Sequence, residues 1–264
     1  MYALSDRHGS ANLHVVTGLT YLSPPTPFPA DDPFVRLLQA CPNLEEFQLV
    51  GQGLDPLDHD WDDLVVELPP MEDFQPLNLP KLRIVSLLNM HASPLMLALL
   101  HSTLPSLQKL TLTPYDDLPH PIALVSSLIM AHGPSLSYLE LFTPKSWPTR
   151  LRPSPQNLFA LAPNLRHLSL ENPLPDLVID APHNLEILSI PRPRADFWRI
   201  LERLFPQLPK LAVLRAREVK WLRKGISSMA ENTGVQGEMR EWKRRLARRG
   251  IKMLDMDWNE ESLA

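Results

Sequence analysis

The sequence predicts an α/β fold in which one parallel sheet is built from a repeated unit of a strand and its connection. Leucine makes up 50 of the 264 residues and proline 29, whereas glycine contributes only 9. These leucines and prolines recur together in the order Pro-x-Leu-x-x-Leu-x-Leu. Successive copies begin 20 to 38 residues apart, and segments with helical apolar spacing lie between them.

Strands are expected where the leucine pattern occurs. In Leu-x-x-Leu-x-Leu the last two leucines lie two residues apart, so on a strand they point to the same face. One strand cannot bury that face alone, but stacked copies form a continuous core. Pattern and spacing are typical of leucine-rich repeats. Seven clear copies begin at Leu44, Leu82, Leu107, Leu136, Leu165, Leu185 and Leu211, with degenerate copies near Leu13 and Ile251.

The predicted fold is therefore a leucine-rich repeat solenoid, a single domain over residues 1–264. A curved parallel sheet is expected on its concave side and irregular helices on its convex side. Helices are expected over roughly residues 31–41, 93–100, 121–129, 154–161 and 197–204, because apolar residues recur there at helical spacing. Four of these segments have a proline within their first three residues, and proline suits the first turn of a helix.

The step from Leu165 to Leu185 is the shortest and contains Pro173 and Pro175. Proline removes a hydrogen-bond donor and clashes inside a helix. We therefore expect an extended turn there and no full helix.

An acidic insertion at residues 51–78 interrupts the repeats. The segment Asp58–Asp62 has the Asp-x-Asp-x-Asp opening of a calcium-binding loop. The rest of that pattern fails, because Asp63 replaces the glycine of the sharp turn and Pro69 replaces the closing glutamate. We therefore predict a solvated acidic loop rather than a metal site.

A basic segment at residues 215–264 is expected to cap the last repeat. Residues 215–252 contain twelve Lys and Arg against four Glu. A helix is expected over residues 238–249, with Gly250 as its stop and an apolar stripe of Met239, Trp242 and Leu246. Two interpretations stay open, a polar cap that keeps the array soluble and a basic contact surface for nucleic acid or an acidic partner.

Motifs for catalysis and cofactors do not occur in the sequence. It has no phosphate-binding glycine loop, no His-Glu-x-x-His, no Cys-x-x-Cys and no Gly-x-Ser-x-Gly. We expect no enzyme activity, no cofactor and no metal, and we expect the single cysteine, Cys41, to be a small buried side chain. Because the sequence contains no apolar leader, no membrane-length apolar run and no Asn-x-Ser/Thr site, the protein is expected to be intracellular, cytoplasmic or nuclear.

A protein partner is expected on the concave face, which is lined by the residues between and after the leucines. Tyr138 and Phe142 are the expected anchor, since two aromatic side chains on one face of a strand are typical of an interface. The alternative expectation for Phe142 is that its side chain is buried under a neighbouring loop and does not contact a partner. The predicted partner-binding residues are Lys109, Thr111, Tyr138, Glu140, Phe142, His167, Ser169, Arg215 and Arg217.

The proline-led leucine repeats, their irregular spacing and a strand-like tail at residues 251–258 resemble the leucine-rich-repeat region of F-box proteins, especially the divergent fungal set. The resemblance implies a protein-interaction module that recognises the substrate of an F-box-type ubiquitin ligase. The F-box itself is not found in residues 1–30, so a Skp-type adaptor is implied only through an F-box outside this chain. The alternatives are a free-standing repeat scaffold and a nucleic-acid-associated protein that uses the basic C-terminal segment.

Overall fold

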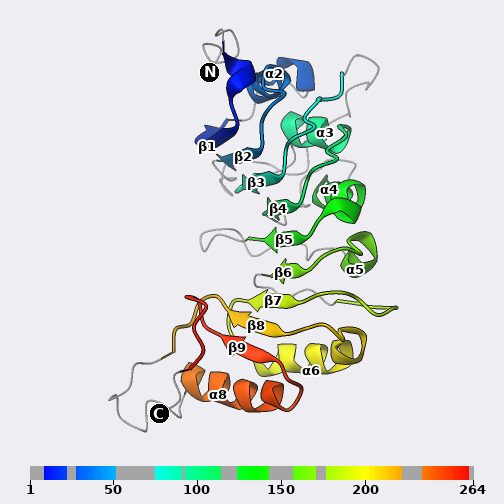
Figure 1. The fold of residues 1–264 in the computed structure, drawn as a ribbon. Helices are drawn as coiled ribbons and strands as arrows, with labels where there is room; N and C mark the ends of the chain where they lie inside the picture. Colours follow the sequence, from blue (N-terminus) through cyan, green and yellow to red (C-terminus); the bar gives the residue numbers. More distant parts are fainter. Residues whose placement is uncertain are drawn as a thin grey trace, which may run out of the picture.

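The computed structural model describes residues 9–22, 28–51, 75–90, 93–113, 124–142, 157–170, 177–221 and 234–261. It shows an α/β fold with one sheet of nine parallel strands. Each strand pairs with the one before it in the chain, so the strands lie in sequence order (Figure 1). They are β1 (Val15–Tyr21), β2 (Glu46–Gly51), β3 (Ile84–Leu88), β4 (Lys109–Leu112), β5 (Tyr138–Leu141), β6 (His167–Ser169), β7 (Ile187–Ile190), β8 (Val213–Ala216) and β9 (Lys252–Leu254).

The leucine pattern forms the core, as predicted. The middle positions of the pattern pair with one another across neighbouring strands, and all of them are almost fully buried. Because these side chains are in register, they form one continuous apolar row from strand to strand. The row consists of Phe47, Val85, Leu110, Leu139, Leu168, Leu188, Leu214 and Met253.

The entry to each strand is held by a recurring backbone contact. The carbonyl oxygen of Glu45 accepts hydrogen bonds from the N–H groups of Arg83 and Ile84, at 2.8 and 3.1 Å. The same double contact to the next unit is made by the carbonyl groups of Arg83, Gln108, Ser137, Arg166 and Glu186. Equivalent positions of successive units therefore make equivalent bonds.

Side chains in the Pro-x-Leu turns also connect neighbouring units. The residue between proline and leucine donates to a backbone carbonyl of the preceding unit at three turns. The donors are Asn43 to Ala11, Ser106 to Pro80 and Asn164 to Pro134, at 2.6–2.8 Å. A polar side chain at this position thus gives a hydrogen-bond donor to a backbone carbonyl that lies outside the strands and has no partner in the sheet.

Helices lie between the strands and cover the leucine side of the sheet. Figure 1 shows α2, α3, α4 and α5 following one another along one side of the sheet, and α8 beside β9 at the C-terminal end. The helices are α2 (Pro33–Gln39), α3 (Pro94–Leu100), α4 (Leu124–His132), α5 (Leu158–Leu161), α6 (Ala195–Leu204) and α8 (Gly234–Ala247). No helix occurs in the described residues 165–170 and 177–185, and the extended turn expected at Pro173 and Pro175 lies outside the described residues.

Proline and a polar cap begin the first two of these helices. The Asp32 carboxylate accepts a hydrogen bond from the Phe34 N–H at 2.8 Å, and Pro33 occupies the first turn of α2. Ser93 caps α3 in the same way, with Pro94 in its first turn. The proline starts expected at residues 121 and 155 lie outside the described residues.

The C-terminal end agrees with the predicted helix, stop and strand. Helix α8 begins four residues before the expected start, and its stripe of Met239, Trp242 and Leu246 is buried. Gly250 has a φ of 73°, a left-handed conformation in which glycine ends helices. Residues 52–74 of the acidic insertion, with its aspartates, lie outside the described residues. Cys41 is fully buried, as expected, and burial raises the pKa of its thiol.

Replacing Leu139 with alanine tests the continuous core. The side chain lies in the central strand β5 and is fully buried, so Leu139→Ala should lower the free energy of unfolding by about 2–5 kcal/mol. Met130→Ala is the control, because Met130 is 60% exposed on α4. Urea denaturation measures both variants, and an equal, small effect of the two would contradict a shared core.

Candidate functional site

The candidate site lies on the sheet face opposite the leucine rows, which we call the polar face. It is formed by the residues that alternate with the buried leucines. Seven of the nine residues predicted for partner binding lie at such positions on the strands, and Phe142 and Arg217 directly follow β5 and β8 in the same alternation. On β2, β3 and β5 the side chains of this face are half-buried, whereas Thr111 on β4, the two polar-face residues of β6 and Ser189 on β7 are buried. The change in burial marks a region where side chains of several strands contact one another.

One part of that region is an ion-pair network between β5 and the end of β8. Arg217 Nη1 lies 2.6 Å from Glu140 Oε1, and its Nη2 donates to the Leu170 carbonyl at 3.1 Å. The Tyr138 hydroxyl donates to Glu140 Oε2 at 3.0 Å. Both charged side chains are mostly buried, and burial together with the Glu140 charge raises the pKa of Tyr138. Glu140 is therefore held by two donors from different strands.

A second part is a row of three aromatic rings with one cation at each end, which we call the cation–aromatic cluster. Lys109 Nζ lies 4.7 Å from the centre of the Tyr138 ring, which packs edge-on against His167 at 4.4 Å. The His167 ring meets Trp258 at 5.8 Å, and the Arg215 guanidinium lies over the Trp258 ring at 4.3 Å. The cluster thus joins residues of β4, β5, β6 and β8 to the residues that follow β9.

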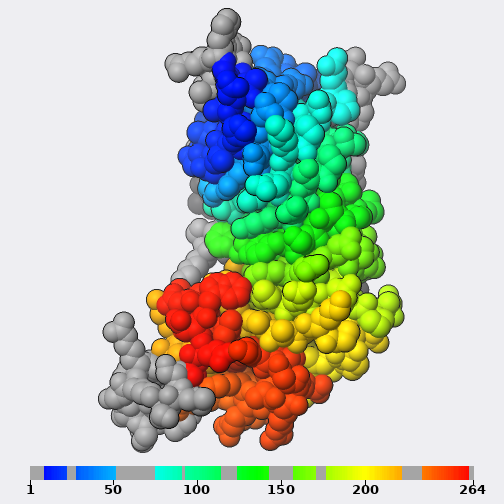
Figure 2. Space-filling view, viewed as in Figure 1, coloured from blue at the N-terminus to red at the C-terminus, as the bar shows by residue number. Residues whose placement is uncertain are grey.

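The turn at residues 255–259 places Trp258 in this cluster. The buried Asp255 carboxylate accepts hydrogen bonds from the N–H groups of Asp257 and Asn259, both at 2.9 Å. Trp258 adopts a φ of 65°, which is uncommon for a residue other than glycine. Arg215 Nη2 donates to the Met256 carbonyl at 2.6 Å. In Figure 2 these C-terminal residues, coloured red, lie against the preceding strands.

His167 lies at the centre of the cluster and is neutral at physiological pH. Burial, together with the positive charges of Arg215, Lys109 and Arg217, lowers its pKa to about 4. Its Nε2 lies 2.8 Å from the Ser189 hydroxyl. A histidine and serine at this distance could form a nucleophile–base pair. Ser189 is fully buried, however, and the charges around His167 are cations rather than the carboxylate that would strengthen a base, so the pair is a structural contact.

The structure brings together most of the predicted site residues. Six of the nine belong to the ion-pair network or to the cation–aromatic cluster: Lys109, Tyr138, Glu140, His167, Arg215 and Arg217. Ser169 is on the same face but is fully buried, and its hydroxyl has no hydrogen-bond partner among the described residues. Thr111 is almost buried. Phe142 is half-buried after β5, and no ring contact links it to Tyr138 within the described ranges.

Two contributors, Trp258 and Ser189, are absent from the predicted site. Ser189 occupies a polar-face position on β7 and could have been included from its register alone. Trp258 is predicted only as the end of a strand-like tail. Its sequence signal is the surrounding turn chemistry, since aspartate and asparagine at residues 255, 257 and 259 favour turns.

The basic C-terminal segment makes many of its own contacts. Glu261 accepts from Arg240 and Lys243 at 2.7 and 2.8 Å, and Glu241 pairs with Arg244 and Arg245. Arg249 lies over the Phe205 ring at 4.5 Å. These contacts occupy much of the positive charge in the described part of the segment and favour the polar-cap interpretation.

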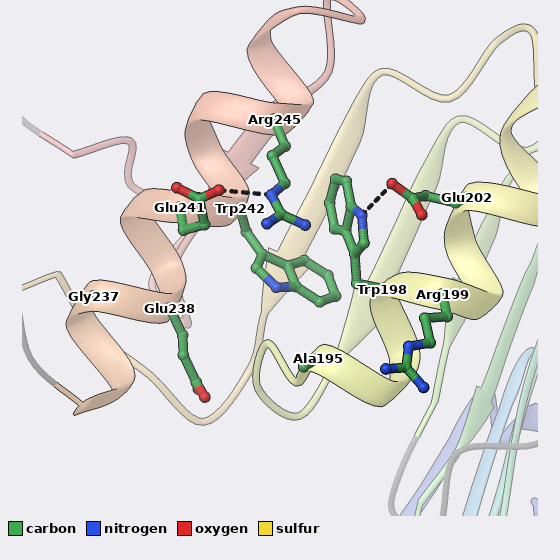
Figure 3. Close-up of a pocket in the computed structure, with 9 residues that line it drawn as sticks. All are labelled: Ala195, Trp198, Arg199, Glu202, Gly237, Glu238, Glu241, Trp242 and Arg245. Atoms are coloured by element: carbon green, nitrogen blue, oxygen red, sulfur yellow. Dashed lines mark hydrogen bonds and ion pairs between the residues drawn. The ribbon is translucent and has the colours of Figure 1, made fainter.

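A hollow of about 530 Å³ lies between α6 and α8 (Figure 3). Trp198 and Trp242 meet edge-to-face at 5.0 Å along its wall. The Trp198 indole donates to Glu202 at 2.6 Å, and Arg245 pairs with Glu241 while its guanidinium lies 5.1 Å from the Trp198 ring. Both tryptophans are buried and these charged groups are paired. The hollow is therefore a gap in the packing between helices α6 and α8.

The described residues lack two kinds of feature, metal-ligand clusters and membrane-spanning helices. They contain no group of three or more His, Cys, Asp or Glu side chains placed to hold a metal ion. None of their helices is long and apolar enough to cross a membrane. No family model, curated protein or solved structure matches the chain.

The environment of His167 predicts how stability depends on pH. An unfolded histidine titrates near 6.5, whereas His167 in the folded protein titrates near 4, so the unfolded state binds the extra proton. The stabilisation that depends on neutral His167 is therefore complete above about pH 6.5 and is lost as the pH falls toward 4, by at most about 1.4 kcal/mol per pH unit.

Urea denaturation of the wild type and of His167→Gln at pH 7 and pH 5 measures this effect. The loss of stability on acidification should be about 1–2 kcal/mol smaller in the variant. His132, whose pKa burial also lowers, is unchanged in both proteins and contributes equally. Equal losses in the two proteins would show that His167 is not the titrating group.

Proposed function

We propose that the chain is a leucine-rich repeat solenoid and that it acts as a protein-interaction module whose polar face binds the partner. The observation that carries the proposal is the cation–aromatic cluster on that face. Tyr, Trp and Arg are the residues that contribute most often to binding energy at protein interfaces. Here Tyr138, Arg215 and Trp258 come from three separate segments and gather at one place.

The recurring contacts support the solenoid part of the proposal. Each unit adds one strand and one core residue to the leucine row, most units add a double backbone contact, and each strand pairs only with the strands beside it. That nearest-neighbour arrangement is the defining property of a repeat array. Irregular spacing between strands is tolerated, because the additional residues lie in the connections.

The contact between Arg217 and Glu140 supports a sheet that is concave on its polar face. Arg217 follows β8 and Glu140 lies on β5, so two other strands separate them. At about 4.8 Å per strand their rows would be about 14 Å apart in a flat sheet. An ion pair of 2.6 Å is more easily reached if the sheet curves so that side chains on this face converge.

The resemblance to F-box proteins extends the proposal to a biological role. In that role the polar face recognises the substrate of an F-box-type ubiquitin ligase, and an F-box outside this chain contacts a Skp-type adaptor. A free-standing scaffold would use the same face without the adaptor. Both roles place the protein inside the cell, in the cytoplasm or nucleus.

Partner capture with a matched pair of variants tests the binding face. The tagged chain is cross-linked in a native lysate and its partners are identified by mass spectrometry, for the wild type, Tyr138→Ala and Met130→Ala. Partners of the polar face should be reduced at least about tenfold by Tyr138→Ala, because interface tyrosines often contribute 1.4 kcal/mol or more. Met130→Ala, on the helix side, should retain them.

The same experiment separates the two roles. A Skp-type adaptor and a cullin recovered with the full-length protein support the ligase role, whereas the same partners without either favour a free-standing scaffold. Circular dichroism at increasing temperature checks that Tyr138→Ala remains folded. A folded variant that retains every partner would overturn the polar face as the binding site.

A further inference from the structure

Two positive charges, those of Lys109 and Arg215, lie at the ends of the cation–aromatic cluster. Within the described part of the chain, no carboxylate pairs with Lys109 or Arg215. The nearest carboxylate of the face, Glu140, is already bound by Arg217 and Tyr138. The face therefore carries positive charge that its own residues do not neutralise.

The carboxylates of the closing turn do not supply the missing partner. Asp255 accepts backbone hydrogen bonds from the turn and from the Trp221 N–H. Asp257 pairs with Lys220 Nζ at 2.7 Å. Arg215, which lies beside this turn, instead donates to the uncharged Met256 carbonyl and lies over the Trp258 ring.

The aromatic rings hold these cations in place without cancelling their charge. A cation over an aromatic face is attracted by the ring quadrupole, but the ring carries no net charge. Lys109 lies over Tyr138 and Arg215 over Trp258, so both cations are positioned before any ligand arrives. Such pre-organisation lowers the entropy lost when a partner binds.

The charge on the face is a local property of this region. The whole chain has a formal net charge of −4, yet the cluster and its ion-pair network hold Lys109, Arg215 and Arg217 against Glu140 alone. The lowered pKa of His167, to which these three cations contribute, is consistent with a positive potential there. A ligand with negative charge would therefore be attracted to this part of the face.

We propose that the cation–aromatic cluster binds an acidic segment of the partner protein, with Lys109 and Arg215 each receiving a carboxylate and Trp258 packing against the segment. This inference rests on the proposed function and specifies its partner chemistry. Trp258 is 44% exposed and so offers apolar surface beside the Arg215 charge.

The strand spacing limits the distance between the two acidic residues. Lys109 and Arg215 lie on β4 and β8, four strand intervals apart, which corresponds to about 19 Å in a flat sheet and less in a curved one. An extended peptide advances about 3.3 Å per residue. The two carboxylates should thus lie no more than about six residues apart in the bound segment.

A peptide is favoured over a nucleic acid by the number and setting of the cations. Only two cations of the cluster lack a carboxylate among the described residues, whereas proteins that bind nucleic acids neutralise many phosphates. The cluster also lies in a chain of net negative charge. Nucleic acid is therefore one of the outcomes that the experiment must distinguish.

Fluorescence anisotropy with a labelled decaglutamate peptide tests the proposal, with decaglutamine and oligothymidylate as comparison probes. The wild type should bind decaglutamate at low salt, more weakly at about 300 mM salt, and should not bind decaglutamine. The double variant Lys109→Gln/Arg215→Gln should bind decaglutamate at least about tenfold more weakly. Arg36→Gln on α2, which removes one charge on the helix side, should bind like the wild type.

Further variants separate charge from folding. Arg215→Lys keeps the positive charge and should retain more affinity than Arg215→Gln, and Trp258→Ala should weaken binding without changing the salt dependence. Thermal unfolding confirms that each protein tested is folded. Absence of decaglutamate binding, equal binding by the folded double variant, or stronger binding of oligothymidylate would each overturn the proposal.

Failure of the acidic-segment proposal can be distinguished from failure of the proposed function. If partner capture depends on Tyr138 while decaglutamate does not bind, the polar face is the binding site but its partner is not acidic. If captured partners are indifferent to Tyr138 as well, the proposed binding face itself is wrong.

Discussion

Burial of the leucine rows between neighbouring strands is the constraint on which the other features depend. A strand of three to seven residues presents too little apolar surface to fold alone, so each unit is stable only against the next. Because the leucines of adjacent strands must meet in register, the residues between them are also brought into register on the opposite face. The order of residues on the polar face is thus a consequence of core packing.

The C-terminal end of the sheet has a second requirement, since the core beside β8 must be covered. Helix α8 and strand β9 supply it, through the buried Met239, Trp242, Leu246 and Met253. The chain then turns at Asp255, and Trp258 reaches Arg215 and His167 on the polar face. The C-terminal segment from α8 to Trp258 therefore both covers the end of the core and completes the candidate site.

Much of the candidate site could be predicted because strands alternate. A period of two is enough to assign Lys109, Tyr138, Glu140, His167 and Arg215 to the polar face. It does not reveal which of these residues touch. The ion pair between Glu140 and Arg217 joins residues 77 positions apart, and it depends on how strands β5 to β8 are arranged in space.

The amino-acid sequence alone was enough to predict the strand positions, the buried leucine rows, most of the helices and the face on which each polar residue lies. These features follow from local periodicity, since the spacing of apolar residues decides which side of a strand or helix must be buried. Three further features are visible only in the folded chain: Ser169 and Ser189 are buried, His167 is surrounded by cations, and Trp258 joins the cluster. Those features arise from contacts between segments far apart in the chain, whose geometry no local pattern contains.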